Sequence, residues 1–180
     1  ANATANEDTA YTVKHWQQTI EAAKENDKND ENIDSDDYTL TDTDELTGTT
    51  DEEVTPETKE YIGFTAPEKK TEKILGDGTL IVNYYYTRNT NTTYKVEHWL
   101  QNLEGDIDTK DEDNYTLKDT DELEGITGER ITPETKEYEG FTAPEAEEIE
   151  ILADGSLVVK YYYTRNTNTP YIVKHWKENL

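Results

Sequence analysis

An internal repeat constrains the fold of this chain more than any other feature. When the sequence is shifted by 77 residues, residues 38–93 align with residues 115–170, and 39 of the 56 aligned positions carry the same amino acid. Further upstream, Tyr11–Trp16 matches Tyr94–Trp99 at a shift of 83, so the first copy has six extra residues in its first loop. The two copies must therefore adopt the same fold, in units of about 80 residues each.

The repeat sets the expected domain boundaries. We expect an N-terminal extension, two repeats and a segment that matches the first strand of a third repeat, at residues 1–10, 11–93, 94–170 and 171–180. The last segment fits either a truncated repeat or a strand donated to another molecule, and the sequence leaves both open. The chain begins at Ala1, which fits a processed start or a fragment. Short polar joints between the copies favour a rod-like array.

Aromatic side chains must form much of the core. Hydrophobic residues make up only 32% of the chain, but 13 Tyr, 3 Trp and 2 Phe are present. Low hydrophobicity combined with high charge is also typical of disorder. Each buried aromatic side chain removes roughly 150–250 Å² from water, which offsets the small number of aliphatic residues. We therefore expect two folded units.

Two segments of each repeat alternate with the period of a β-strand. In Tyr11–Trp16, the side chains of Tyr11, Val13 and His15 share one face. The segment Leu80–Tyr86 alternates in the same way. Positions on the opposite faces change between the copies, which indicates that those faces point outward.

Turn and helix signals complete the predicted fold. Asp77-Gly78 and its counterpart Asp154-Gly155 predict a tight hairpin turn with positive φ. Thr55-Pro56, followed by Gly63, predicts one or two helical turns. The insert Glu21–Asp37 begins with helix formers, but it becomes rich in Asn and Asp and is predicted to be a loop. The expected class is mainly β, with four or five strands and at most one short helix per repeat.

Charge and composition exclude several kinds of partner. The 17 basic and 42 acidic residues give a formal net charge of −25, which repels nucleic acid and anionic lipid headgroups. No apolar run is long enough for a membrane helix, so no membrane insertion is expected. There are no cysteines, so disulfides and thiol chemistry are absent. Cations and basic surfaces remain candidate partners.

An acidic loop in the second repeat offers oxygen ligands for a metal. Its carboxylates are those of Asp106, Asp108, Asp111 and Asp113. Ca²⁺ is bound by 6–8 oxygens, and the loop at residues 26–37 is similarly rich in Asp and Asn. Neither loop has the glycine and distal glutamate of an EF-hand. The sequence therefore leaves two interpretations, a Ca²⁺ site or a solvated acidic loop, and it predicts no other cofactor.

Catalytic chemistry is not expected. His15, His98 and His175 recur at one strand position without further His or Cys ligands, which indicates packed or hydrogen-bonded histidines rather than a metal site. Paired carboxylates arise by chance in so acidic a chain and do not define a glycosidase. We predict that the protein is not an enzyme.

Two sets of side chains are candidates for binding a partner. Tyr85 and Tyr162 are the outward tyrosines of the Tyr-Tyr-Tyr runs, and they predict either an aromatic platform for a glycan or protein, or packing against a neighbouring strand. Tyr171, Val173 and His175 would form the inward face of a donated strand.

The repeat pattern resembles a known group of bacterial repeats. Its elements are Tyr-x-Val-x-His-Trp at residues 11–16, Asp-Thr-Asp-Glu-Leu at residues 42–46, Gly-Phe-Thr-Ala-Pro at residues 63–67 and Tyr-Tyr-Tyr-Thr-Arg at residues 84–88. This order is similar to mucin-binding-protein-like and internalin B-repeat-like modules of Firmicutes surface adhesins. The resemblance covers both copies almost entirely. It implies β-grasp-like α+β domains at the cell surface, without catalytic activity.

Three functions follow as hypotheses. The first is an extracellular, non-catalytic stalk or spacer of an adhesin-like protein. The second is a filament subunit that donates residues 171–180 to another copy, because exposed strands invite pairing. The third is an adhesin module that binds a host or cell-surface glycan or protein. The expected partners are accordingly neighbouring repeats, copies of the same chain, or such a surface ligand.

Overall fold

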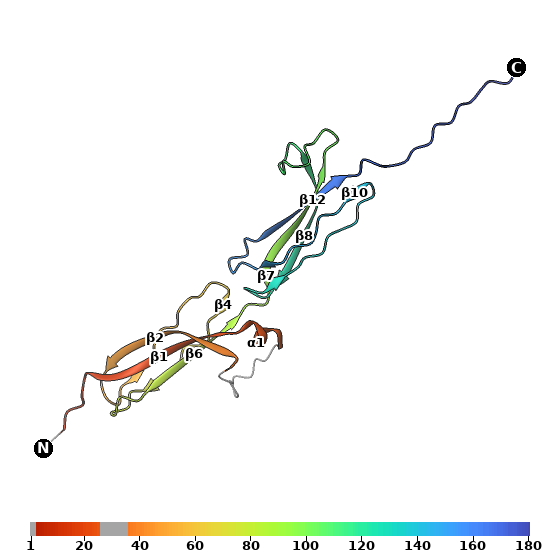
Figure 1. The fold of residues 1–180 in the computed structure, drawn as a ribbon. Helices are drawn as coiled ribbons and strands as arrows, with labels where there is room; N and C mark the ends of the chain where they lie inside the picture. The colour runs from red at the N-terminus through yellow and green to blue at the C-terminus, as the bar shows by residue number, and fades with distance from the viewer. Residues whose placement is uncertain (1–2, 26–35) are drawn as a thin grey trace. The chain divides into compact units, whose positions relative to one another are not determined.

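The computed structural model describes residues 3–25 and 36–180 (Figure 1). This part of the chain is mainly β, with one short helix, which confirms the predicted class. It divides into two compact units. The first contains residues up to Tyr94 with Glu124–Arg130 and Glu150–Ser156, and the second contains Lys95–Leu123, Ile131–Ile149 and Leu157–Leu180. None of the described helices is long and apolar enough to cross a membrane.

The first sheet is built around its first strand. Its elements are β1 (Thr9–Gln18), α1 (Ile20–Glu25), β2 (Tyr38–Gly48), β3 (Glu53–Val54), β4 (Phe64–Thr65), β5 (Glu72–Lys73) and β6 (Ile81–Arg88). The strand order is β2-β1-β6-β4, and β3 pairs separately with β5. The strand β1 runs antiparallel to β2 and parallel to β6, so it lies between two neighbours.

The second sheet repeats this arrangement. Its elements are β7 (Thr92–Gln101), β8 (Tyr115–Gly125), β9 (Arg130–Ile131), β10 (Phe141–Thr142), β11 (Ile149–Glu150) and β12 (Val158–Arg165). The order is β10-β12-β7-β8, with β9 paired to β11. The strand β7 is parallel to β12, as β1 is to β6. Each sheet is therefore centred on the strand that opens its repeat.

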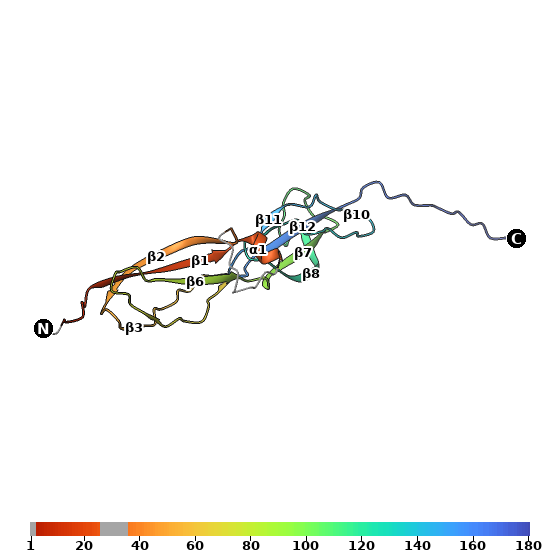
Figure 2. The same ribbon diagram turned by 90° about the horizontal axis from the view of Figure 1, so that it is seen from below.

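One face of the first sheet carries the core. The buried cluster consists of Tyr11, Val13, Ile74, Leu80, Val82, Tyr84 and Tyr86. The predicted faces of β1 and β6 are confirmed, because buried and less buried positions alternate along both strands. The segment between β2 and β4 covers this face through Val54 and Tyr61, and Phe64 of the edge strand β4 packs against the same cluster. Figure 2 shows the part that carries β3 running along the sheet. The opposite face is left to the outward side chains.

The predicted helix after Thr55-Pro56 does not form. Core tyrosines bond to the backbone there: Tyr84 Oη donates to the carbonyl of Pro56 at 2.7 Å, and the backbone N–H of Lys59 donates to Tyr86 Oη at 2.8 Å. These bonds give both hydroxyl groups a partner and pair the backbone carbonyl of Pro56 and the N–H of Lys59 outside any helix. An extended covering segment therefore replaces the helix.

The hairpin prediction is correct for the turn and wrong for the strands. Gly78 has φ of 72° and Gly155 has φ of 74°, as the turn requires. The residue before the turn does not pair with β6, because the Ile74 N–H donates to Glu52 O at 2.9 Å and its carbonyl accepts from Asp51 at 3.0 Å. The preceding strand β5 pairs with β3.

The insert of the first repeat starts with a helix rather than a loop. Thr19 caps α1, since its Oγ1 accepts a hydrogen bond from the Ala22 N–H at 3.2 Å. Ala22 and Ala23 are buried, which holds the helix in place. The rest of the loop prediction falls on residues 26–35, which lie outside the described residues.

Core truncation tests the importance of the covering segment. Ile74 is fully buried, so Ile74→Ala is expected to lower the free energy of unfolding of its unit by about 2–5 kcal/mol, measured by urea denaturation. Ile62→Ala is the matched control, because Ile62 is 74% exposed and should change stability little. Equal effects of the two substitutions would contradict the assigned core.

Candidate functional site

A buried histidine organises the polar interior of the first unit. His15 lies in the middle of β1 and has no exposed surface. Its Nδ1 is 2.8 Å from Tyr86 Oη, and its Nε2 is 2.9 Å from Asp44 Oδ2. The sequence-based expectation of a hydrogen-bonded histidine therefore holds at this position.

The hydrogen bonds form a closed loop that begins and ends at one lysine. The Lys59 backbone N–H donates to Tyr86 Oη, so the tyrosine hydroxyl is left to donate to His15 Nδ1. This direction places the ring proton on Nε2, which donates to Asp44. The Lys59 ammonium then donates to the other Asp44 oxygen at 3.0 Å. The loop joins β1, β2 and β6 to the covering segment.

A second arm extends the network. The Tyr61 hydroxyl donates to Asp42 Oδ2, and the Tyr61 ring packs edge-on against Tyr86 with a centroid distance of 4.8 Å. Among the described residues, every buried side-chain nitrogen and oxygen atom has a hydrogen-bond partner. The interior therefore contains polar groups without unsatisfied ones.

The second unit contains the same network from equivalent residues. His98 Nδ1 is 2.7 Å from Tyr163 Oη, and His98 Nε2 is 2.9 Å from Asp121 Oδ2. Lys136 donates from its backbone to Tyr163 at 2.8 Å and from Nζ to Asp121 at 2.7 Å. Tyr138 donates to Asp119 at 2.6 Å. The duplication has preserved each contact of the loop.

The hydrogen bonds of the network favour the charged forms of Asp44 and Lys59. The hydrogen bond from Lys59 lowers the pKa of Asp44 most; burial opposes this effect, and the hydrogen bond from His15 lowers the pKa further. The hydrogen bond to Asp44 in turn raises the pKa of Lys59. Burial, followed by the bond to Asp42, raises the pKa of Tyr61. Asp121, Lys136 and Tyr138 shift in the same directions.

These charges favour an ion pair over a covalent lysine crosslink. The side chains of Lys59 and Asp44 are 37% and 35% exposed, so water reaches both. An ammonium group has no lone pair with which to attack a carboxyl carbon, and the raised pKa of Lys59 keeps it protonated. The arrangement thus fits a structural polar clamp.

The acidic loop of the second unit does not converge on one point. Asp106 accepts the Asp108 N–H at 3.0 Å, and Asp111 accepts the backbone N–H groups of Asp113 and Asn114, both at 3.1 Å. These are turn-forming bonds within the loop. In residues 3–25 and 36–180, no group of three or more His, Cys, Asp or Glu side chains is placed to hold a metal. The Ca²⁺ interpretation remains a prediction without a preformed site.

The outward tyrosines are partly covered by their neighbours. Tyr85 stacks on Trp16 at a centroid distance of 6.2 Å and 23°, and Lys70 Nζ lies 5.7 Å from the Tyr85 centroid. In the second unit, Tyr162 stacks on Trp99 at 6.2 Å, and Lys110 lies over its ring at 5.8 Å. Lys70 and Lys110 do not occupy equivalent positions of the repeat, yet each lies over the outward tyrosine of its own unit. The structure places each outward tyrosine within an aromatic cluster rather than alone.

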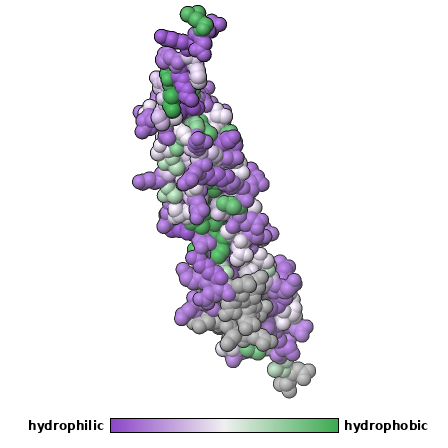
Figure 3. Space-filling view, turned by 90° about the vertical axis from the view of Figure 1, so that its right-hand side faces the viewer, coloured by the Kyte–Doolittle hydropathy of each residue, from purple (hydrophilic) through white to green (hydrophobic). Residues whose placement is uncertain are grey.

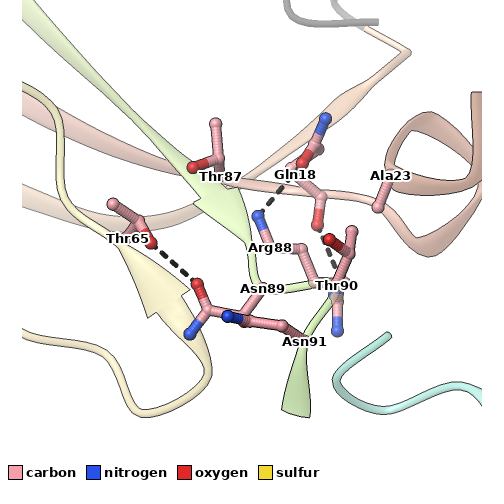
Figure 4. A pocket seen from close by; sticks show the side chains of 8 residues that line it. All are labelled: Gln18, Ala23, Thr65, Thr87, Arg88, Asn89, Thr90 and Asn91. Atoms are coloured by element: carbon pink, nitrogen blue, oxygen red, sulfur yellow. Dashed lines mark hydrogen bonds between the residues drawn. The ribbon is translucent and has the colours of Figure 1, made fainter. Parts of the chain in front are cut away.

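A cavity of about 250 Å³ lies at the end of β6 (Figure 4). Its polar groups bond to one another: Thr65 Oγ1 donates to Asn89 Oδ1 at 2.7 Å, and the Arg88 backbone N–H donates to Gln18 Oε1 at 3.0 Å. Among the residues that the structure describes, those that line it include no carboxylate, histidine or lysine. This lining does not support acid–base catalysis.

The candidate donor strand has no regular structure. The segment 171–180 leaves the second sheet without forming a strand, and its side chains are exposed. Tyr171, Val173 and His175 therefore do not belong to either network.

Sequence inspection alone missed the clamp residues. Asp44, Lys59 and Tyr61 lie in blocks that are identical in the two copies, which was the available signal. Their common role depends on tertiary contacts between residues that are 15 to 71 positions apart in the sequence.

Comparison with known proteins gives weak structural similarities. No family model matches the chain, and no curated protein matches it. The solved structure of Mub-RV is 14% identical with a TM-score of 0.29, covering 88% of this chain and 99% of that one. The Bacillus anthracis TIE protein is 12% identical with a TM-score of 0.37, covering 89% of this chain and 34% of that one. The shaft pilin SpaA from Lactobacillus rhamnosus GG is 11% identical with a TM-score of 0.28, covering 93% and 100%. No functional assignment depends on similarities at this level.

Replacing the histidine tests the clamp directly. His15→Phe removes the hydrogen bonds to Asp44 and Tyr86, and leaves the buried hydroxyl short of one partner. We expect the free energy of unfolding to fall by about 1–3 kcal/mol in urea denaturation. His175→Phe is the control, because His175 is exposed and should have no effect. Equal stabilities of the two variants would contradict the clamp.

The loss of folding stability at low pH tests the charges of Asp44 and Asp121. Because the folded pKa values of Asp44 and Asp121 lie below 3.8, their contribution is present above about pH 4 and is lost as the pH falls through those lower values. Asp44→Asn with Asp121→Asn should therefore flatten the loss of stability below pH 4. The effect should be about 1 kcal/mol or less per site, since both carboxylates are partly exposed. The exposed Asp8→Asn is the control, and an unchanged acid limb in the double variant would contradict the assignment.

Proposed function

We propose that this chain is a non-catalytic spacer module of an extracellular cell-surface protein. The main support is the position of the amino-acid differences between the two repeats. Of the 56 aligned positions, 17 differ, and none of these is buried in the first repeat. The duplication has retained the residues that hold the fold and has varied the solvated ones. A spacer requires only a stable fold and a hydrated surface, and retained buried residues with varied exposed ones are sufficient for both.

The surface supports the same role. Acidic residues outnumber basic ones by 42 to 17, so copies of the chain repel one another in solution. The face in Figure 3 is mainly hydrophilic, with small, separate hydrophobic areas. Such a surface favours a module that stays hydrated beside its neighbours. The resemblance of the repeat pattern to adhesin repeats supports the location at the cell surface.

Glycan or protein binding through Tyr85 and Tyr162 is less favoured. Each ring is stacked on a tryptophan and has a lysine over it, so part of its surface is already in contact with other side chains. A ligand that needs the ring face would have to displace the cation.

A filament subunit is the second candidate function. The observation that favours it is the extended segment after β12, which carries the exposed side chains of Tyr171, Ile172 and Trp176 at 84–87% exposure. Large apolar groups of this kind favour contact with another surface.

Small-angle scattering tests the spacer role. Two units joined as a rod should give a radius of gyration well above the roughly 16 Å expected for a compact protein of 180 residues. Deleting residues 171–180 is the control, because an extended tail also raises this value. A radius near 16 Å for the shortened chain would contradict a rod-like spacer.

A further inference from the structure

We propose that the long edge strand of each sheet, β2 in the first unit and β8 in the second, binds an extended segment of another protein in which basic and apolar side chains alternate. The segment adds to the sheet as one more strand, through backbone hydrogen bonds. This inference goes beyond the spacer role and does not depend on it, because a spacer needs no partner at its strand edges.

The first sheet has one long open edge. Its strand order is β2-β1-β6-β4, so β2 lies at the edge, beside β1 in Figure 1. Within residues 3–25 and 36–180, β1 is the only strand that pairs with β2. The strand β2 has 11 residues, whereas β4 at the other edge has two. A long edge presents backbone groups to which another strand can bond.

The backbone groups that face outward can be assigned. The Thr12 N–H donates to Leu80 O at 3.0 Å, so the backbone of Thr12 faces the β6 side of β1. Thr12 lies opposite Glu45. Opposite residues of an antiparallel pair either exchange both hydrogen bonds or exchange none, so the N–H and C=O of Glu45 point away from β1. Those of Thr43 and Thr47, two residues away on each side, point the same way.

The second sheet has an equivalent edge. Its order is β10-β12-β7-β8, which places β8 at the edge. The Lys95 N–H donates to Leu157 O at 3.0 Å, as the Thr12 N–H does to Leu80 O. Lys95 Nζ is 3.4 Å from Glu122 Oε1, so Glu122 stands beside Lys95 as Glu45 stands beside Thr12. The two units therefore offer the same docking edge.

The edge strand is retained between the copies although most of it is exposed. The segments Tyr38–Gly48 and Tyr115–Gly125 carry the same amino acid at 9 of 11 positions. By contrast, residues 69–73 are also exposed, and all five differ from their counterparts at 146–150. Exposure alone therefore does not explain the differences between the copies, and the edge strand is an exception to the variation of solvated positions.

The fold does not account for the glutamate of this strand. Asp42 and Asp44 belong to the clamp, because they accept hydrogen bonds from Tyr61 and Lys59. Glu45 lies outside the clamp and is exposed. Glutamate is depleted in strands, so strand propensity does not favour it either. A positively charged partner gives a role to Glu45 and to its counterpart in the second unit.

Charge selects a basic segment rather than a second copy of the chain. The strand β2 has three acidic residues and no basic one, and β8 has four acidic residues and one basic one, Lys118. Pairing two such strands would bring like charges together, which destabilises a sheet. Lysine or arginine side chains beside Glu45 or Glu122 would instead be attracted.

The other face of the edge requires apolar side chains. Leu46 lies opposite Tyr11, on the core face of the sheet, and is 38% exposed; its counterpart Leu123 is 41% exposed. Alternate side chains of an added strand lie beside Glu45 on one face and beside Leu46 on the other. Basic residues at the first set of positions and apolar residues at the second match both faces.

The first unit should bind more tightly than the second. Glu45 accepts a hydrogen bond at 3.4 Å from the neutral Thr12 hydroxyl, whereas the ammonium of Lys95 lies 3.4 Å from Glu122. The bound segment must therefore compete with a lysine of the chain itself only in the second unit.

NMR titration of the isotope-labelled full chain tests the proposal. The probe is a peptide of the length of β2, blocked at both ends, in which lysine and valine alternate. We expect it to shift the amide signals of Thr43 and Glu45, and to slow hydrogen exchange at both N–H groups several-fold, because each gains a hydrogen bond. The signals of Thr120 and Glu122 should follow at higher peptide concentration.

Two control peptides separate strand addition from general attraction. A peptide that alternates glutamate and valine should not bind, because its charge is wrong. The lysine peptide with methylated backbone nitrogens at alternate residues keeps its charge but lacks the donors for the edge, and should bind about tenfold more weakly or not at all.

Substitutions test the edge from the side of the protein. Thr43→Pro removes an outward N–H, which an edge strand tolerates, and should weaken binding to the first unit about tenfold, whereas Thr43→Val keeps the N–H and should not. Glu45→Lys with Glu122→Lys should abolish binding of the lysine peptide and allow binding of the glutamate peptide. This surface variant retains the test if Thr43→Pro does not fold.

Three results would overturn the proposal. The first is the absence of amide shifts on addition of the lysine peptide. The second is equal binding of the methylated peptide, which would reduce the contact to non-specific attraction. The third is protection of amides elsewhere while those of Thr43 and Glu45 exchange as before.

Discussion

The two hydrogen bonds of a buried histidine hold each repeat together. His15 and His98 have no exposed surface, and each connects a tyrosine of the last long strand to an aspartate of the second. The aspartate fixes a lysine whose backbone returns to the same tyrosine, so the segment that covers the core is bonded to the sheet. This polar frame explains how a chain with few aliphatic residues can close a core.

The strands and their faces could be predicted because alternation of side chains is a local property. The shared face of Tyr11, Val13 and His15 follows from the two-residue alternation of side chains along a β-strand. The covering segment could not be predicted in the same way: Thr55-Pro56 has a good local helix signal, but Tyr84 and Tyr86, more than 25 residues away, take its backbone groups. Tertiary bonds therefore override local propensity there.

The candidate site was predicted only in part, for a related reason. The histidine was recognised as a strand residue, whereas Asp44 lies in a strand of Thr, Asp and Glu that has little hydrophobic pattern. The outward tyrosines were placed on the correct face, but their capping by Lys70 and Lys110 depends on segments that differ between the copies. Sequence comparison of two copies reveals which residues are retained, and only geometry reveals what they contact.

The parallel pairing of β1 with β6 has a mechanical consequence. The chain enters the first sheet through β1 and leaves it through β6, and the two strands are adjacent and point the same way. A force that pulls these ends apart acts along the strands, so it loads all the hydrogen bonds between them at once. Antiparallel neighbours joined at a hairpin would instead unzip one bond at a time. Each repeat is thus connected so that tension on its ends is resisted in shear.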